Sequence, residues 1–294
     1  MSAKTINGLL LFTIICISLS AIFVRLSDAP STVMVMYRML LGSMLIIPFV
    51  FKERHSFTKI SGMDWLRLSF AGLFLAGHFG LWFESLNHTT VASSTLILCL
   101  QPAIALIGGL LFFKERIHKS TIVTLSIAFI GVIIVAGGNV NLGPGVMYGN
   151  LLSFLSVFSV VLYLLIGQRT VKSVNHWVYS FIVFMFAALF MVGFNLVQNV
   201  PFTGYTSHDW LIFLLLAIFP TGAHLIYNLL LNYVNTTTVS ISTLGEPIGA
   251  STLAAIFLGE MFTTVELIGG VLIITGIYLF LRSQSSMYKI KEPS

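Results

Sequence analysis

Two side chains that can carry a charge stand well inside long apolar stretches of this chain: Arg38 and Glu246. A charge in such a place faces a cavity or a partner, because burying it in apolar surroundings is costly. The planar guanidinium of Arg38 suits a carboxylate. Glu246 precedes Pro247, which removes a helical hydrogen bond, and it suits an ammonium group or a proton. The pair predicts recognition of a zwitterionic small molecule such as an amino acid, while a structural role stays open for each residue.

Imidazole and aromatic side chains are expected near the same place. His78 and Trp82 are four residues apart and share one face of a helix, and His224 and Tyr227 occupy comparable positions later in the chain. Such groups suit a ring-bearing or amino-acid-like ligand, and packing in the core is the alternative, above all for the Trp and the Tyr. The predicted substrate-binding residues are Arg38, His78, Trp82, Gln101, His224, Tyr227 and Glu246.

A second group of residues is predicted to act in gating or in structure: Arg25, Glu84, Pro102, Glu115, Pro247 and Glu260. Arg25 and Glu84 lie near the ends of apolar segments, where a long charged side chain can reach the membrane surface. Glu115 and Glu260 end corresponding segments and are expected to pair with basic neighbours. No motif for catalysis, metal binding or nucleotide binding occurs in the sequence, so neither a cofactor nor enzymatic activity is expected.

The composition is that of a membrane protein. Hydrophobic residues make up 57% of the chain and charged residues 9%, against roughly 25% charged residues in a soluble domain. Thirteen of the 15 Lys and Arg residues fall into five clusters, at positions 4, 52–67, 114–119, 169–172 and 282–291. Long apolar stretches separate these clusters, as expected when basic residues stay in the cytoplasm. The net charge of +5 therefore indicates orientation and not binding of nucleic acid.

Apolar length predicts ten transmembrane helices, since a span needs about 20 mostly apolar residues. The expected spans are 6–26, 31–51, 66–86, 91–113, 119–138, 146–167, 176–197, 210–230, 237–258 and 264–282. Ten spans and the basic clusters place both termini in the cytoplasm of a protein of the cell membrane. A cleaved signal peptide is the alternative for the first span, but its apolar run exceeds the roughly 7–15 residues of such a signal. Cys16 and Cys99 fall in apolar segments and are expected to be free, buried thiols.

The sequence contains an internal repeat. Residues 65–138, shifted by 145 positions without gaps, align with 210–283 at 11 identities in 74 positions. The matches include Trp65 with Trp210, Asn87 with Asn232, Pro102 with Pro247, and Glu115 with Glu260. Each repeat holds five spans, and an odd number makes the halves enter the membrane from opposite sides, as in many secondary transporters. We expect an all-α integral membrane fold with inverted repeats at 1–140 and 145–284 and a cytoplasmic tail at 285–294.

Three stretches carry a resemblance to a known family. They are Ala21-Ile22-Phe23-Val24-Arg25-Leu26-Ser27-Asp28-Ala29-Pro30 leading to Tyr37-Arg38, Gln101-Pro102-Ala103 running to Lys114-Glu115-Arg116, and Gly245-Glu246-Pro247-Ile248 running to Gly259-Glu260. Through them the chain resembles the drug/metabolite transporter superfamily, specifically its ten-helix EamA-type carriers, over essentially its whole length. The resemblance implies transport of amino acids, other metabolites, purine-type compounds or drugs. Many relatives carry a Trp in the first span, where this chain has Ser18-Leu19-Ser20-Ala21, so no role of that Trp is carried over.

The sequence thus favours a secondary transporter, expected to export a small metabolite by alternating access between its halves. The alternative is a channel or a receptor-like membrane protein without coupled transport. Expected partners are a small-molecule substrate and the lipid bilayer; proton coupling and a homodimer stay open. Because the repeat pairs Gln101 with Glu246, the halves are not chemically equivalent, which fits an asymmetric substrate.

Overall fold

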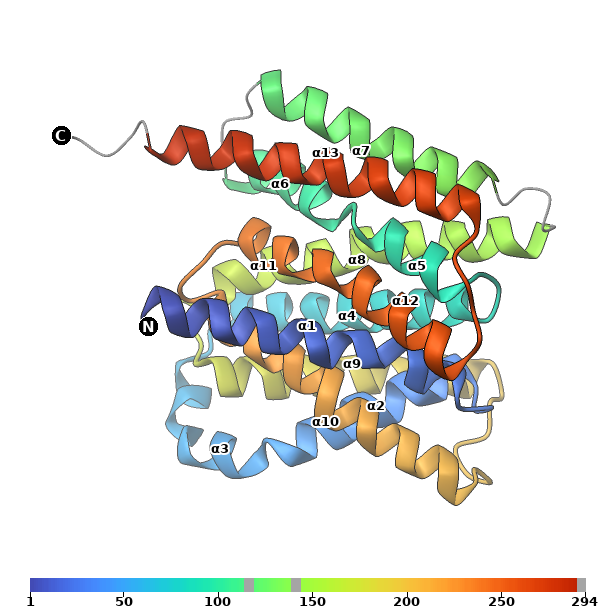
Figure 1. Ribbon diagram of the computed structural model, residues 1–294. Helices are drawn as coiled ribbons and strands as arrows, with labels where there is room; N and C mark the ends of the chain where they lie inside the picture. Colours follow the sequence, from blue (N-terminus) through green and yellow to red (C-terminus); the bar gives the residue numbers. More distant parts are fainter. Residues whose placement is uncertain (114–118, 139–143, 290–294) are drawn as a thin grey trace.

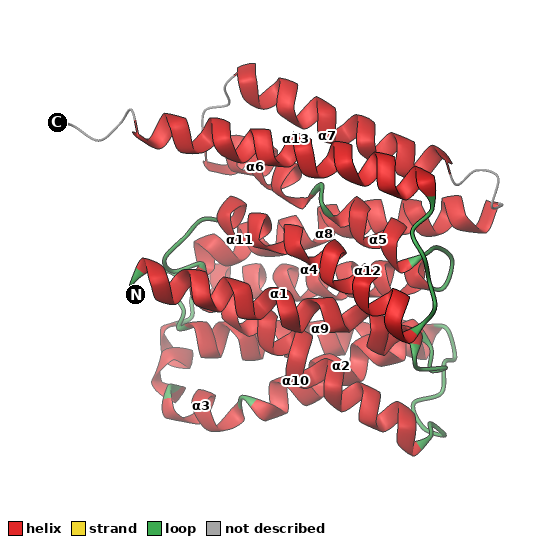
Figure 2. Ribbon diagram, viewed as in Figure 1, coloured by secondary structure: helices red, strands yellow, loops and turns green. Residues whose placement is uncertain are grey.

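The computed structural model of this chain describes residues 1–113, 119–138 and 144–289. In these ranges all regular secondary structure is helical (Figure 2). The elements of the first half are α1 (Ala3–Arg25), α2 (Ser31–Leu45), α3 (Ile47–Lys52), η1 (Arg54–Lys59), α4 (Gly62–Leu86), α5 (Val91–Leu98), α6 (Gln101–Phe113) and α7 (Lys119–Gly138). Those of the second half are α8 (Pro144–Thr170), α9 (His176–Val197), α10 (Ser207–Leu230), α11 (Thr236–Ser242), η3 (Thr243–Gly245), α12 (Glu246–Phe257) and α13 (Thr264–Lys289).

Six described segments are long and apolar enough to cross a membrane. They are Lys4–Arg25, Gly62–Leu86, Val91–Phe113, Pro144–Thr170, His176–Val197 and Ser207–Leu230. Three shorter apolar helical stretches accompany them: Ser31–Leu45, Ser126–Val135 and Thr264–Gly276. The first residues expected in the C-terminal tail, 285–289, continue α13, and the rest of that tail lies outside the described residues.

Helix starts follow the spacing of the internal repeat. The helices α2 and α9, α4 and α10, α5 and α11, α6 and α12, and α7 and α13 each begin 145 positions apart. Polar caps fix some of these starts: the hydroxyl of Thr90 accepts from the Ser93 amide at the start of α5, and Thr206 forms a capping box with Asp209 at the start of α10. Local sequence thus sets where equivalent helices begin.

Three of the predicted spans are divided into two helices each, and a loosened helix was expected only beside Pro247. Residues 31–51 divide at Ile46 into α2 and α3, residues 91–113 divide after Leu98 into α5 and α6, and residues 237–258 divide at η3 into α11 and α12. A proline stands in the first turn after each break: Pro48, Pro102 and Pro247. Proline has no amide hydrogen to donate to the carbonyl four residues earlier, so the helical hydrogen bonding is interrupted there.

The uninterrupted helices α7 and α13 lie at one edge of the molecule. Helix α4 packs along α8 and α9, while α1 packs against α10 and α12. Figure 1 shows α7 and α13 side by side at the top of the view. Glycines allow their close approach: a Cβ added to Gly276 would lie 2.5 Å from the amide nitrogen of Ala128. The centre of the helix bundle is therefore formed by the other helices.

Candidate functional site

A small buried cavity lies where α1, α2, α4, α8 and α10 meet the starts of α6 and α12. Its volume is about 30 Å³, which is room for about two or three water molecules, since each needs roughly 10–15 Å³ by this measure. All seven residues predicted to bind substrate line this one cavity: Arg38, His78, Trp82, Gln101, His224, Tyr227 and Glu246. The structure thus brings the whole predicted set together, and the binding role of these residues stays a prediction.

Arg38 lies on α2 and is fully buried. Its Nε donates to the hydroxyl of Thr221 at 2.9 Å, and its Cζ lies 3.6 Å from the centroid of the Phe79 ring. Neither terminal nitrogen, Nη1 or Nη2, has a hydrogen-bond partner among the residues that the structure describes. Buried donors are nearly always paired, so two unpaired donors at a cavity indicate a place for an acceptor of a ligand. The two nitrogens of one guanidinium suit a bidentate anion such as a carboxylate.

Pro220 explains how Arg38 is oriented. A proline inside a helix leaves the carbonyl four residues earlier without its amide donor, and in α10 that carbonyl belongs to Leu216. The hydroxyl of Thr221 donates to the Leu216 carbonyl at 3.0 Å and accepts from Arg38 Nε. The Leu216 carbonyl left free by Pro220 therefore positions the hydroxyl that fixes the guanidinium.

Glu246 is the first residue of α12 and is buried at 7% exposure. Its carboxyl group makes no hydrogen bond and no ion pair within 4 Å with any residue that the structure describes. Arg38 and Glu246 line the same cavity without direct contact, so the two opposite charges are separated. A direct ion pair between them, one of the structural alternatives, is absent from this arrangement.

The imidazoles and aromatic rings form one wall of the cavity. His78 contacts the carbonyl of Ser156 through Nδ1 at 3.1 Å, and because a carbonyl only accepts, Nδ1 carries the proton and Nε2 of the neutral ring is an acceptor. The ring of His78 lies parallel to Trp82, with an interplanar angle of 5° and centroids 6.2 Å apart. The Nε1 of Trp82 and the Nδ1 of His224 are buried without a partner. Further unpaired polar atoms therefore surround the cavity.

Gln101 and Glu246 occupy equivalent places at the two breaks. Each is the first residue of the second helix of an interrupted segment, and each is followed by a proline, Pro102 or Pro247. The Gln101 side chain donates to the hydroxyl of Ser240 at 3.2 Å. The amino ends of α6 and α12, which carry a partial positive charge, thus lie at the cavity, so Pro102 and Pro247 shape the backbone beside it.

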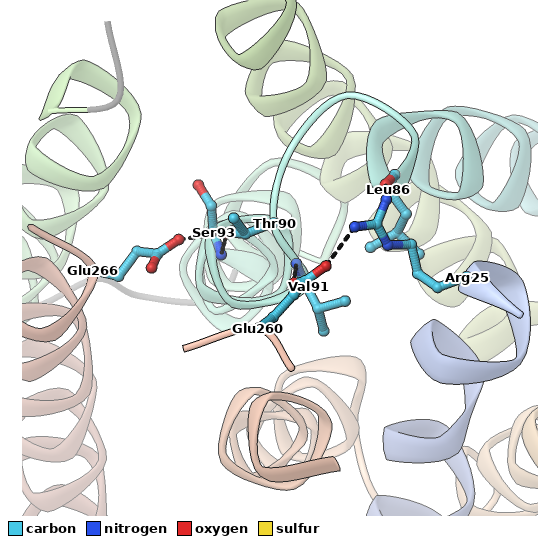
Figure 3. Close-up of polar contacts among 7 residues, drawn as sticks. All are labelled: Arg25, Leu86, Thr90, Val91, Ser93, Glu260 and Glu266. Carbon is cyan, nitrogen blue, oxygen red and sulfur yellow. Dashed lines mark hydrogen bonds and ion pairs between the residues drawn. The ribbon is translucent and has the colours of Figure 1, made fainter. Parts of the chain in front are cut away.

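A second polar cluster lies where the end of α1 and the start of α5 meet the segment between α12 and α13 (Figure 3). Arg25, at the end of α1, forms an ion pair with Glu260 and donates to the carbonyl of Leu86 at 2.8 Å. The other carboxylate oxygen of Glu260 accepts from the backbone amide of Val91, the first residue of α5, at 2.9 Å. We call Arg25, Leu86, Val91 and Glu260 the end clasp. It ties α1, α4 and α5 to the segment between α12 and α13.

The remaining predicted gating residues lie elsewhere or cannot be placed. Glu84 lies near the end of α4, away from the cavity, and contacts His88 at 3.1 Å. Glu266, which was not among the predicted gating residues, accepts from the hydroxyl of Thr90 next to the end clasp. Glu115 lies outside the described residues. The expected pairing with a basic neighbour is therefore seen only for Glu260.

Several cavity residues were missed from the sequence: Ser20, Phe79, Pro220 and Thr243. Two of them carried a usable signal. Pro220 stands alone in an apolar segment, and the shift of 145 positions aligns Phe79 with His224. The predicted free, buried state of Cys16 and Cys99 is confirmed.

Comparison with known proteins identifies the family. A sequence profile of the EamA-like transporter family matches residues 5–137 and again residues 147–282. The chain belongs to this family. The match confirms the resemblance drawn from the sequence. Together with the six apolar segments, it makes the protein a multi-pass membrane transporter for a small-molecule substrate, and not an enzyme.

Individual relatives agree with this assignment. An uncharacterized transporter of Archaeoglobus fulgidus is 25% identical over 95% of this chain and 98% of its own. The uncharacterized transporter YetK of Bacillus subtilis is 27% identical over 87% of this chain and 78% of its own. A probable amino-acid metabolite efflux pump of Salmonella typhimurium is 25% identical over 87% of both chains. One crystal structure shares the fold, with a TM-score of 0.70 at 16% identity, covering 95% of this chain and 98% of that chain.

Proposed function

We propose that the protein is a secondary transporter that exports a small zwitterionic metabolite, an amino acid or a related amphipathic compound, across the cell membrane. One observation carries the proposal: the terminal nitrogens of Arg38 and the carboxyl group of Glu246 are buried on one cavity, and neither group has a hydrogen-bond partner among the described residues. Arg38 takes the carboxylate of the substrate, and Glu246 takes its ammonium group or the coupling proton. The Salmonella relative, a probable amino-acid metabolite efflux pump, is compatible with such a substrate.

The proposed mechanism is alternating access between two inverted halves of five spans each, 1–140 and 145–284, with both termini and the tail 285–294 in the cytoplasm. Two features support it. The family profile matches once in each half, and equivalent helices begin 145 positions apart. Helices interrupted at a central site are a recurrent feature of secondary transporters. A cavity of about 30 Å³ must widen before an amino acid enters, and rearrangement of the halves supplies that change.

The energy source follows from the same site. The ammonium group of the substrate and a proton compete for the carboxylate of Glu246. This competition couples export of the substrate to import of a proton. We propose proton exchange on this ground. A homodimer is a separate proposal.

Reconstituted vesicles test the proposal. Purified protein is first screened against amino acids and related compounds by thermal shift, because a ligand bound to the folded state raises the melting temperature. Each ligand found is then tested for counterflow, in which external unlabelled substrate drives exchange of labelled substrate. Saturable counterflow supports a carrier. Passive, non-saturable flux would favour a channel, and binding without flux would favour a receptor-like protein.

A further inference from the structure

We propose that a lateral groove between α4, α6 and α8 binds the head group and one acyl chain of a phospholipid with a single net negative charge. The groove has a volume of about 410 Å³. Its apolar wall is formed by Phe70, Phe74, Phe113, Leu162 and Ile166, among others, and Arg67 and Arg169 line it as well. None of these residues lines the central cavity, so the groove is a separate site.

Both arginines lie at the same depth. Arg67 stands in the second turn of α4, and Arg169 is the last residue but one of α8. Helices α4 and α8 pack against each other and run in opposite directions in Figure 1. Arg67 therefore lies at the amino end of one helix, beside the carboxyl end of the other, where Arg169 lies. This is the end of the molecule at which α1 begins and α13 ends.

The apolar wall extends from the arginines toward the middle of the bilayer. Phe74 follows Arg67 by seven residues and Leu162 precedes Arg169 by seven, which is about 10 Å along each helix at 1.5 Å per residue. Phe70 is 46% exposed, and the rings of Phe70 and Phe74 lie 6.4 Å apart. An exposed aromatic face on a membrane helix faces lipid. The groove thus has an apolar wall along its length and a basic rim, formed by Arg67 and Arg169, at one end.

The charge of the rim matches one phosphodiester. Arg67 Nη1 donates to Asp64 at 2.8 Å, and the other oxygen of Asp64 accepts from the hydroxyl of Ser61 at 2.7 Å. Asp64 is thus already neutralised by Arg67, and Arg169 makes no hydrogen bond or ion pair with the part of the chain that the structure describes. Among the described residues of the rim, the charges of Arg67, Asp64 and Arg169 leave one net positive charge. Basic pockets between helices at the cytoplasmic surface bind anionic lipid head groups.

The test compares two phospholipids with identical acyl chains and, as a third ligand, a head group without acyl chains. Purified protein in a zwitterionic detergent is titrated with phosphatidylglycerol, phosphatidylcholine or soluble glycerophosphoglycerol, and binding is followed by native mass spectrometry and by melting temperature. We expect tighter binding of phosphatidylglycerol than of phosphatidylcholine. Arg169→Gln should weaken phosphatidylglycerol about fivefold, from the worth of one basic residue near a membrane surface, and should leave phosphatidylcholine unchanged.

Two further variants make the result specific. Lys172→Gln removes an exposed charge near the same helix end but outside the groove, so it should leave phosphatidylglycerol binding intact. Leu162→Trp fills the apolar wall without changing charge and should weaken both lipids. The proposal fails if Lys172→Gln equals Arg169→Gln, if both lipids bind wild-type protein equally, or if glycerophosphoglycerol alone gives the full shift. Arg169 is exposed, so its variant is expected to fold, and the melting temperature without lipid verifies this.

Discussion

The ring of Phe79 and the imidazole of His224 meet edge to face with centroids 4.9 Å apart, and the two residues are 145 positions apart in the chain. The same spacing relates Gln101 to Glu246. Equivalent residues of two repeats touch only near the axis that relates the repeats, so this contact supports a pseudo-twofold axis through the cavity. In the proposed arrangement of inverted halves, the two sides of the cavity differ in chemistry, with Phe79 opposite His224 and Gln101 equivalent to Glu246. A site of this kind can bind the two different ends of a zwitterion.

Replacing Arg38 tests the carboxylate site. Arg38→Gln should abolish binding of carboxylate-bearing ligands while the protein still expresses and folds, because its terminal nitrogens have no protein partner to lose. A lost charge-assisted bidentate contact costs about 3 kcal/mol or more, which is at least about a hundredfold in affinity. Thermal shift with each ligand measures the loss. Thr221→Val, which removes only the hydroxyl beside Nε, should cause a smaller loss by misplacing the guanidinium.

The double variant distinguishes binding from structure. If Arg38 and Glu246 stabilise each other across the cavity without a ligand role, each single neutral variant leaves one buried charge unbalanced and lowers the folded yield. The double variant Arg38→Gln, Glu246→Gln would then recover both yield and transport. We expect the reverse: normal yields for the single variants and no transport by the double variant.

The difference between Gln101, an amide, and Glu246, a carboxyl group at the equivalent position, gives a second prediction. Glu246→Gln should remove the pH dependence of transport, because it leaves no carboxyl group at either helix break. Adding Gln101→Glu to this variant moves the acid to the equivalent position of the other half. If the axis relates the two sites functionally, part of the pH dependence should return. Counterflow measured across a pH series provides the comparison, and a pH profile unchanged in Glu246→Gln would exclude this residue from proton coupling.

The end clasp gives a third prediction. Glu260→Ala removes both the ion pair with Arg25 and the acceptor for the Val91 amide, so that end of the molecule should open more often. A Cys introduced at Ser20, which lines the cavity, should react with a membrane-impermeant thiol reagent about fivefold faster, given about 1 kcal/mol for a partly exposed charge pair. Glu84→Ala is the matched control, since Glu84 contacts only its neighbours on α4 and the following turn. Equal acceleration by both variants would argue against the clasp.

Side chains on the cavity were predictable from the sequence because charged and imidazole groups in apolar segments have few alternatives to an interior site. Arg38 and Glu246 are of this kind. The interruption of the helices was predictable only in part. Pro247 indicated a loosened helix, but the extent of η3 depends on packing that no local sequence pattern encodes. Phe79 was missed because a Phe in an apolar helix is ordinarily core. Its role beside Arg38 is fixed by how α2 meets α4, which the sequence does not specify.

Orientation in the membrane is a fourth prediction. Thr203 lies in the segment between α9 and α10, and Ser173 in the turn between α8 and α9, and both are exposed. With both termini in the cytoplasm, a Cys at Thr203 in intact cells should react with a membrane-impermeant thiol reagent, and a Cys at Ser173 should react only after permeabilisation. The native Cys16 and Cys99 are buried and should give a low background. The opposite labelling pattern would invert the proposed topology.

The glycine contact between α7 and α13 gives the last prediction. A Cβ on Gly276 would lie 2.5 Å from the Ala128 nitrogen and 2.8 Å from the Thr124 carbonyl oxygen, and backbone atoms cannot move aside as a flexible side chain would. Gly276→Ala must therefore push the two helices apart, and overpacking of this kind costs about 1–3 kcal/mol in the free energy of unfolding.

Gly193→Ala on α9 is the matched control, because nothing lies within 4 Å of its added Cβ and alanine is favoured over glycine inside a helix by about 0.5–1 kcal/mol. The two alanine variants should thus shift the melting temperature in opposite directions, Gly276→Ala downward and Gly193→Ala upward. Since α7 and α13 contribute no residue to the cavity, ligand affinity at a temperature where both variants are folded should equal that of the wild type. A melting temperature of Gly276→Ala at or above the wild-type value would mean that α7 and α13 do not pack through this glycine in the membrane.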